Sequence, residues 1–303
     1  MLLVYIIIQL RGAWEACQST RGLTLFGVTM LLVMLRVGNP AWAQDSSRVP
    51  VVIDGQNVGL EIRIYKPSTE GKVPTLVFNH GSTGTGRDPI LFTKPERFPQ
   101  LARFFVQRGW AVVMPSRRGR GGSEGEYDEG FAIDRSRGYT CDPSLSIPGA
   151  DRALRDIEAA MGAILTMPFV DGNRVVIGGE SRGGILSVAY AGQHPEQVKG
   201  VINFVGGWLG FGCKTASTVN QEIFKRGARY TGDTIWLYAY PDRFYPMFHS
   251  RENFAAFQAA GGKGVFHGFP PGSGGHGIAA RPDVWTSVLD AYLKRRGLAN
   301  EER

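Results

Sequence analysis

The chain has 303 residues, a formal charge of +7 and 43% hydrophobic residues, with no low-complexity tract and no internal repeat. This composition is ordinary for a globular protein and excludes a disordered or fibrous chain. The basic residues are scattered and have neither a recognition motif nor an aromatic-interleaved stripe, so we expect no nucleic-acid partner.

The N-terminal end has the layout of a secretory signal peptide. An apolar stretch at residues 23–35 follows Arg21 and precedes Ala41-Trp42-Ala43. At roughly 13–16 residues it is shorter than the ~20 that span a bilayer. We therefore expect residues 1–43 to be a signal peptide cleaved after Ala43, and the mature protein to be secreted or periplasmic without stable membrane association. The alternative is an uncleaved anchor, and a second apolar run at residues 1–10 leaves the translation start open.

The next segment predicts strands. Residues 49–53 and 60–65 alternate apolar and polar side chains around Asp54-Gly55, which indicates an antiparallel hairpin at a sheet edge. Beyond it, short apolar runs typical of strands buried on both faces cover residues 75–78, 111–114, 174–177, 201–204, 234–240 and 264–266.

Helical segments separate these runs. Apolar stripes at helical spacing comprise Phe98, Leu101, Phe104 and Phe105, then Leu154, Ile157, Ala160, Met161 and Ile164, and two later helices contain Phe254 and Trp285. Alternating strands and helices predict a single α/β domain over residues 44–303, with a doubly wound, mostly parallel sheet. Its active site is expected beyond the carboxyl ends of the strands. Residues 116–146 have no clear period, and we interpret them as a flap over that site.

The strongest motif surrounds Ser181. Gly179-Glu180-Ser181-Arg182-Gly183 contains Gly-x-Ser-x-Gly between an expected buried strand and an expected helix. A serine on so sharp a turn needs neighbours without side chains, and the N-terminus of the following helix points at the position of an oxyanion. Ser181 is therefore the candidate nucleophile.

A serine hydroxyl needs a base to remove its proton. The candidate histidines are His80, His194, His249, His267 and His276. His276 lies in a glycine-rich loop between the last expected strand and the last helix, whereas His267, the second choice, ends a strand beside Phe266. Asp242 directly follows the strand at 235–240 and is the candidate acid, with a turn-forming role as the alternative.

These motifs resemble the α/β-hydrolase superfamily and, within it, the dienelactone-hydrolase and prolyl-oligopeptidase-like branch. The resemblance covers residues 75–293 and depends on the order of His80-Gly81-Ser82, Arg118-Gly119-x-Gly121-Gly122-Ser123, the serine motif, Pro241-Asp242 and Gly274-Gly275-His276-Gly277. It implies an oxyanion hole formed by the N–H groups of Arg182 and Ser82. His80-Gly81-Ser82 departs from the commoner His-Gly-Gly form of that second loop.

Arginines gather where the substrate is expected to enter. Arg118 and Arg120 follow the fourth strand, and Arg135 lies in the flap. Because a guanidinium binds a carboxylate or phosphate by paired hydrogen bonds, one hypothesis assigns these arginines to an anionic substrate group. The alternative is that they brace the loop through acidic partners such as Glu124 and Glu126.

Cys141 and Cys213 remain after the leader, which contains Cys17. Two cysteines in an exported chain predict one disulfide, which would tie the flap across the pocket; two free buried thiols are the alternative. Neither cysteine has a metal-binding neighbourhood, and we expect no metal or cofactor.

Together these features predict an exported serine-dependent hydrolase of carboxylic esters or lactones. Its small-molecule substrate would be cleaved through an acyl-enzyme. A peptidase of the prolyl-oligopeptidase type and a catalytically silent binding protein on the same fold are the alternatives.

Overall fold

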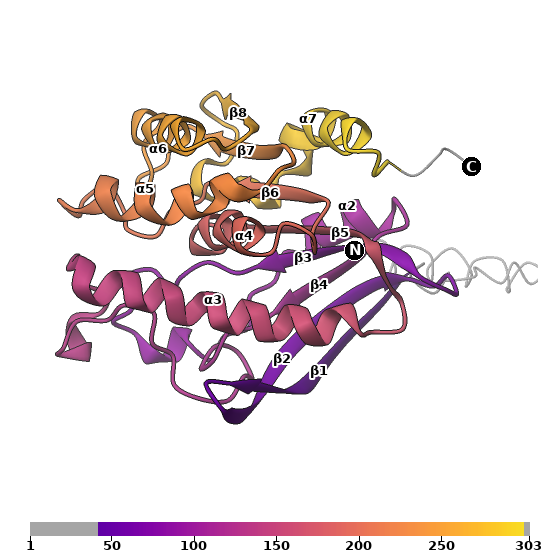
Figure 1. Ribbon diagram of the computed structural model, residues 1–303, viewed down its shortest axis with the longest axis horizontal. Helices are drawn as coiled ribbons and strands as arrows, with labels where there is room; N and C mark the ends of the chain where they lie inside the picture. The colour runs from indigo at the N-terminus through magenta and orange to yellow at the C-terminus, as the bar shows by residue number, and fades with distance from the viewer. Residues whose placement is uncertain (1–41, 300–303) are drawn as a thin grey trace, which may run out of the picture. The chain divides into compact units, whose positions relative to one another are not determined.

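The computed structural model describes residues 42–299 (Figure 1). The expected signal peptide, residues 1–43, lies outside the described residues except for the Trp42–Ala43 backbone. The strands of the described part form one eight-stranded sheet. They are β1 (Trp42–Ile53), β2 (Gln56–Pro67), β3 (Val73–Asn79), β4 (Ala111–Pro115), β5 (Val170–Glu180), β6 (Gly200–Phe204), β7 (Thr234–Ala239) and β8 (Gly264–Phe269).

The strand order is β1-β2-β4-β3-β5-β6-β7-β8. β1 pairs antiparallel with β2, and β2 pairs antiparallel with β4, whereas every later pair is parallel. The predicted fold class is therefore confirmed, including its antiparallel hairpin at the N-terminal edge. At the other end of the order, β8 is the second edge strand.

The N-terminal hairpin is longer than the sequence pattern indicates. Its strands pair from Trp42 with Pro67 to Ile53 with Gln56, around a two-residue turn at Asp54 (φ 53°) and Gly55 (φ 77°). Two positive φ values in succession are those of a tight hairpin turn. Residues 44–48 belong to an edge strand and are mostly exposed. They therefore lack the apolar alternation that marks the buried half of the hairpin.

Helices cover both faces of the sheet. They are α2 (Pro99–Val106), α3 (Pro143–Leu165), α4 (Arg182–Gln193), α5 (Ala216–Arg226), α6 (Met247–Ala259) and α7 (Pro282–Arg295), with short 3₁₀ turns η1 (Pro89–Leu91), η2 (Arg135–Arg137), η3 (Gly227–Arg229) and η4 (Gly275–Ala280). α3, α4, α5 and α6 follow one another on one face, and α2 contacts α7 on the other (Figure 1). None of the helices in residues 42–299 is both long and apolar enough to cross a membrane.

α3 begins inside the segment that we interpreted as a flap. Asp142 caps it, accepting a hydrogen bond from Ser144 N at 2.9 Å, and Pro143 occupies its first turn. Pro148 and Gly149 then interrupt the helical pattern of the sequence. Gly149 packs directly on Gly130 of the flap, where an added Cβ would lie 2.2 Å from the Gly130 nitrogen.

The parallel strands end together, and this brings the functional candidates to one edge. Asn79 of β3 is level with Gly179 of β5, Glu180 with Phe204 of β6, and Ala239 of β7 with Phe269 of β8. The loops that begin at these points therefore meet, which is where an open α/β sheet binds its ligands.

Candidate active site

Ser181 occupies the sharp turn between β5 and α4. Its backbone has φ 57° and ψ −123°, a conformation that costs a non-glycine residue about 1–3 kcal/mol. The neighbouring glycines make this turn possible because the β3 backbone passes closely. A Cβ on Gly183 would lie 2.0 Å from the Asn79 carbonyl oxygen, and one on Gly179 would lie 2.4 Å from Gly183. The predicted strand–serine–helix turn is thus the observed one.

His276 and Asp242 come from two loops that follow β7 and β8. His276 Nδ1 lies 2.8 Å from Asp242 Oδ2, and Asp242 Oδ1 accepts hydrogen bonds from the Phe244 and Tyr245 amides at 2.8 and 3.1 Å. Gly275, with φ 56°, permits the approach, since a Cβ there would lie 2.3 Å from the Pro241 oxygen. With Nδ1 engaged by a carboxylate, His276 Nε2 is the nitrogen left to accept a proton.

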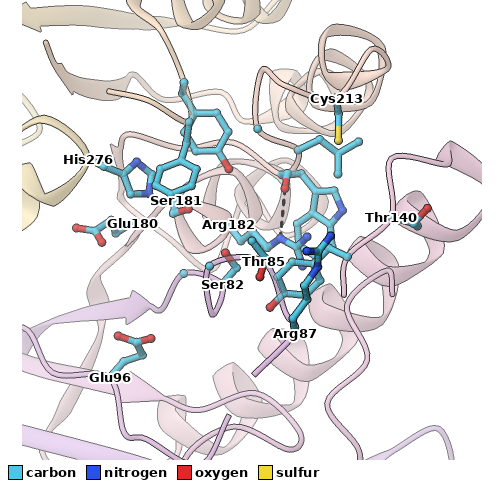
Figure 2. Close-up of a pocket in the computed structure, with 18 of the residues that line it drawn as sticks. Ser82, Thr85, Arg87, Glu96, Thr140, Glu180, Ser181, Arg182, Cys213 and His276 are labelled. Atoms are coloured by element: carbon cyan, nitrogen blue, oxygen red, sulfur yellow. Dashed lines mark hydrogen bonds between the residues drawn. The ribbon is translucent and has the colours of Figure 1, made fainter. Parts of the chain in front are cut away.

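A cavity of about 330 Å³ opens above the serine turn (Figure 2). Its lining includes Ser82, Arg87, Glu96, Arg137, Tyr139, Glu180, Ser181, Arg182, Trp208, Cys213, Phe244, Tyr245 and His276. Figure 2 shows Ser181 and His276 close to each other on one side of this cavity, with Thr140 and Cys213 on the other. Asp242 does not line it and lies behind His276.

Tyr245 connects the acid loop to the serine. Its hydroxyl donates to the Gly207 carbonyl oxygen at 2.7 Å and also interacts with the Ser181 side chain. Burial raises the pKa of Tyr245 to about 12, so the phenol stays neutral. Its ring lies 5.5 Å from that of His276, and Phe244 lies 4.7 Å away on the same loop.

The two expected oxyanion donors are both without a hydrogen-bond acceptor in the described part of the chain. The amides of Arg182 and Ser82 donate to no backbone or side-chain acceptor there, and both residues line the cavity. The loop that contains Ser82 lies against the serine, since a Cβ on Gly81 would come within 3.1 Å of Ser181 Cβ.

His80 holds this loop. Its Nε2 accepts a hydrogen bond from the Arg117 amide at 3.1 Å, and its Nδ1 lies 2.8 Å from the Gly81 oxygen. Burial, and then the charges of Arg117 and Arg120, hold the pKa of His80 well below its ordinary value. His80 is therefore neutral and bonded through both ring nitrogens, which suits a structural role.

The arginines offered as substrate ligands are placed elsewhere, and this corrects the expectation. Arg118 donates to Asp156 at 2.6 Å and to Asp54 at 2.9 Å, Arg120 donates to Glu96 at 2.9 Å, and Arg135 lies 3.3 Å from Glu126. None of the three lines the cavity. A buried guanidinium needs a carboxylate partner, so Arg118 and Arg120 brace their loops, whereas Arg135 is partly exposed and pairs with carboxylates of the flap.

Arg182 lines the cavity, and its guanidinium is engaged beside the flap. The guanidinium lies between the rings of Tyr139 and Trp208, 3.8 and 4.1 Å from their centroids, and donates to the backbone carbonyl oxygen of Glu129 at 2.7 Å. Glu129 also pairs with Arg117. Burial alone would raise the pKa of Glu129, but the charge of Arg117 and its hydrogen bond lower it.

The predicted disulfide is present between Cys141 and Cys213, whose Cα atoms are 5.5 Å apart. It joins the end of the flap to the loop after β6, and Cys213 lines the cavity. No group of three or more histidine, cysteine, aspartate or glutamate side chains placed to hold a metal ion occurs within residues 42–299.

Sequence reasoning missed several residues of the cavity. Glu180 stands inside the serine motif, so position alone could have indicated it. Glu96, Tyr139 and Trp208 follow no motif, and only the tertiary structure brings them to the site.

This sheet and serine turn define the α/β-hydrolase superfamily. The profile of the family described as X-Pro dipeptidyl-peptidase (S15 family) matches residues 54–228, and the chain belongs to that family.

Similarity to individual proteins is more distant. The quorum-quenching protein AidA of Acinetobacter baumannii (strain MDR-ZJ06) is 30% identical over 134 residues, which are 44% of this chain and 36% of AidA. The chain thus spans about a third of that relative.

Among solved structures, the acetyl xylan esterase from Paenibacillus sp. R4 has a TM-score of 0.57 at 16% identity, covering 86% of this chain and 90% of the esterase. The Pyrococcus horikoshii acylaminoacyl peptidase has a TM-score of 0.58 at 16% identity, covering 86% of this chain and 42% of the peptidase. At these identities the likeness concerns the fold.

Proposed function

We propose that this protein is an exported serine hydrolase that cleaves carboxylic esters or lactones through an acyl-enzyme. The observation that carries the proposal is the 2.8 Å contact between His276 Nδ1 and Asp242 Oδ2 beside a cavity that Ser181 also lines. This pairing orients the imidazole and stabilises its protonated form, as a base for serine requires.

In the proposed reaction, Ser181 Oγ attacks the ester carbonyl while His276 Nε2 takes its proton. The amides of Arg182 and Ser82 donate to the oxyanion, and His276 then protonates the leaving alcohol. Water then attacks the acyl-enzyme by the same steps and releases the carboxylic acid. The disulfide supports the exported location, since such bonds persist in oxidising compartments.

The test compares hydrolysis of p-nitrophenyl acetate and butyrate by the wild-type protein, Ser181→Ala and Ser68→Ala. Ser68 is an exposed serine outside the cavity and serves as the matched control. We expect Ser181→Ala to lose activity by a factor on the order of 10⁶, and Ser68→Ala to retain it. Absence of turnover by the wild type, together with absence of Ser181 labelling by a fluorophosphonate, would favour the silent binding protein instead.

A peptidase is the second candidate, and the S15 family membership favours it. The same triad would serve an amide substrate. The discriminating measurement is the ratio of kcat/KM for p-nitrophenyl butyrate to that for alanyl-proline p-nitroanilide. Faster turnover of the anilide would replace the esterase proposal by the peptidase.

A further inference from the structure

Exposed aromatic side chains gather at the mouth of the cavity, and the proposed triad gives them no role. Among residues 44–299 the exposed aromatic side chains are those of Phe211, Tyr240, Phe244 and Phe248. The rings of Phe211 and Phe248 lie 4.9 Å apart and nearly perpendicular, and the Phe211 amide donates to the Phe244 carbonyl oxygen at 2.8 Å. Phe211, Phe244 and Phe248 thus form one contiguous surface, which we call the aromatic platform. Single exposed apolar side chains are common, whereas a contiguous group indicates a binding surface.

Three segments that are separate in the sequence build this platform. Phe211 lies in the loop after β6, Phe244 lies in the loop after β7, and Phe248 lies in the first turn of α6. α5 and α6 pack side by side (Figure 1), which brings the loop before α5 to the start of α6. The platform is therefore a product of helix packing at the edge of the sheet where Ser181 also lies.

Buried polar side chains fix the loop that presents Phe211. Asn220 of α5 accepts hydrogen bonds from the Trp208 and Leu209 amides, both at 2.9 Å, through its Oδ1. The Nδ2 atom of Asn220 lies 3.1 Å from Nε2 of His249, whose ring is 5.5 Å from that of Phe211. Phe211 is therefore held on a rigid support while its own ring stays exposed.

The platform is continuous with the cavity through Phe244. The Phe244 ring lines the cavity, and its centroid lies 4.7 Å from that of His276. Gly210 also lines the cavity, directly before Phe211, and a Cβ there would lie 3.9 Å from Phe244 Cδ1. Because position 210 has no side chain, nothing at that residue separates Phe211 from the cavity. An apolar surface thus extends outwards from His276 along Phe244 to Phe211 and Phe248.

The proposed reaction determines which part of an ester meets this surface. His276 Nε2 protonates the leaving alcohol, so the alcohol oxygen must lie within hydrogen-bond reach of that nitrogen. The substituent on this oxygen is then beside the His276 ring and next to Phe244. The acyl group, in contrast, stays on Ser181 after the alcohol has left.

The size of the platform fits a ring better than a protein partner. Phe211, Phe244 and Phe248 are 45%, 38% and 53% exposed, so together they expose about 300 Å². A stable protein interface buries about 800 Å² on each partner. Aromatic rings attract a further ring edge-to-face or offset, which favours an aromatic group over an alkyl chain.

From this arrangement we propose that the aromatic platform binds an aromatic ring on the alcohol part of the substrate. A short chain would join this ring to the ester oxygen, because Phe211 and Phe248 lie beyond Phe244 as seen from His276. The inference rests on the proposed function, and it narrows the substrate to esters of arylalkyl alcohols. Phe211 and Phe248 would thereby determine specificity for the leaving group.

The kinetic experiment compares two isomers, 3-phenylpropyl acetate and methyl 4-phenylbutanoate, which place the same ring and chain on opposite sides of the ester. It also uses propyl acetate and methyl butyrate, which lack the ring. In the wild type, the ring should raise kcat/KM about tenfold or more on the alcohol side and less on the acyl side. An equal or larger gain on the acyl side would overturn the proposal, and this comparison needs no variant.

The variants are Phe211→Ser, Phe248→Ser, the double variant, Phe248→Tyr and the control Val52→Ser. Val52 lies in β1, is 65% exposed and is remote from the cavity lining. The ratio of kcat/KM for 3-phenylpropyl acetate to that for its isomer should fall about tenfold in the double variant. It should stay at the wild-type value in Val52→Ser and remain close to it in Phe248→Tyr, which keeps the ring. An unchanged ratio in the double variant would overturn the proposal.

A binding measurement separates this inference from the proposed function. Ligand-observed NMR titration gives the affinities of wild type, the double variant and Val52→Ser for 3-phenyl-1-propanol and 1-propanol, and it needs no turnover. Loss of the preference for phenylpropanol in the double variant alone would support the platform, even if ester hydrolysis failed. Equal preference in all three proteins would overturn it, even if ester hydrolysis were established. A wild-type dimer that the double variant converts to a monomer, with an unchanged isomer ratio, would assign the surface to a second copy of the chain instead.

Discussion

The two sides of the cavity treat buried charge in opposite ways. On the flap side, Glu129 pairs with Arg117, and Arg182 is stacked between two rings and donates to the carbonyl oxygen of Glu129. On the side of His276, Glu180 has no hydrogen-bond or ion-pair partner in the described residues, and its charged neighbours are also negative. Both sides are built from loops at the same edge of one sheet.

This difference separates charges that stabilise the fold from a charge that opposes it. A buried ion pair whose members satisfy each other resists loss of either partner, because the remaining charge would be stranded. An unpaired carboxyl group in a partly buried position opposes folding once it is ionised. Changes on the flap side should therefore reduce stability, and changes on the histidine side should alter activity.

Apart from the loss of the nucleophile itself, the largest effect is expected at Asp242. Asp242→Asn keeps a side chain that can accept the Phe244 and Tyr245 amides but no longer stabilises a protonated His276. Loss of kcat by a factor on the order of 10⁴ should follow, with an unchanged far-UV circular dichroism spectrum. The control is Asp233→Asn, because Asp233 precedes β7 and lies at the opposite end of that strand. A similar loss in both variants would contradict the assignment.

On the flap side, Glu129→Gln should cost about 3–5 kcal/mol of unfolding free energy in urea denaturation, because it leaves Arg117 buried without its carboxylate. Glu126→Gln removes an exposed partner of Arg135 and should cost about 1 kcal/mol or less. If both variants had the same stability, the distinction between the two sides of the cavity would fail.

The disulfide should make the next largest contribution to the stability of the flap side. Reducing Cys141–Cys213, which closes a 72-residue separation, should lower the unfolding free energy by about 3 kcal/mol. The double variant Cys141→Ser/Cys213→Ser should reproduce this loss and show no further response to dithiothreitol. Sensitivity of the double variant to the reductant would mean that the effect has another origin.

The smallest expected effect has the opposite sign. Glu180 has a pKa of about 8 in the folded protein, above the ordinary 4.5, so the folded state prefers its neutral form. The resulting penalty is absent below pH 4.5, grows as the pH rises and is complete above pH 8. Glu180→Gln should therefore stabilise the protein by about 2 kcal/mol at pH 9, allowing for partial exposure, and by almost nothing at pH 5. Thermal unfolding at both pH values measures this; destabilisation at pH 9 would show that Glu180 has a partner.

The sequence by itself determined the features that depend on short-range backbone geometry and burial. The period of apolar residues predicted the hairpin and the parallel strands, and the spacing of Gly179, Ser181 and Gly183 predicted a turn that only such residues can form. The expected export and the number of cysteines predicted the disulfide. These inferences succeed because each uses residues adjacent in the chain or a constraint on the whole chain.

Only the tertiary structure decided which charges are paired. Arg118 and Arg120 resembled substrate ligands in the sequence, but their partners Asp156 and Glu96 are 38 and 24 residues away in the chain. The unpaired state of Glu180 was equally hidden, although the residue stands inside the clearest motif. The free energy of a buried charge depends on all groups within a few ångströms, and folding brings these together from distant segments, so no local pattern records it.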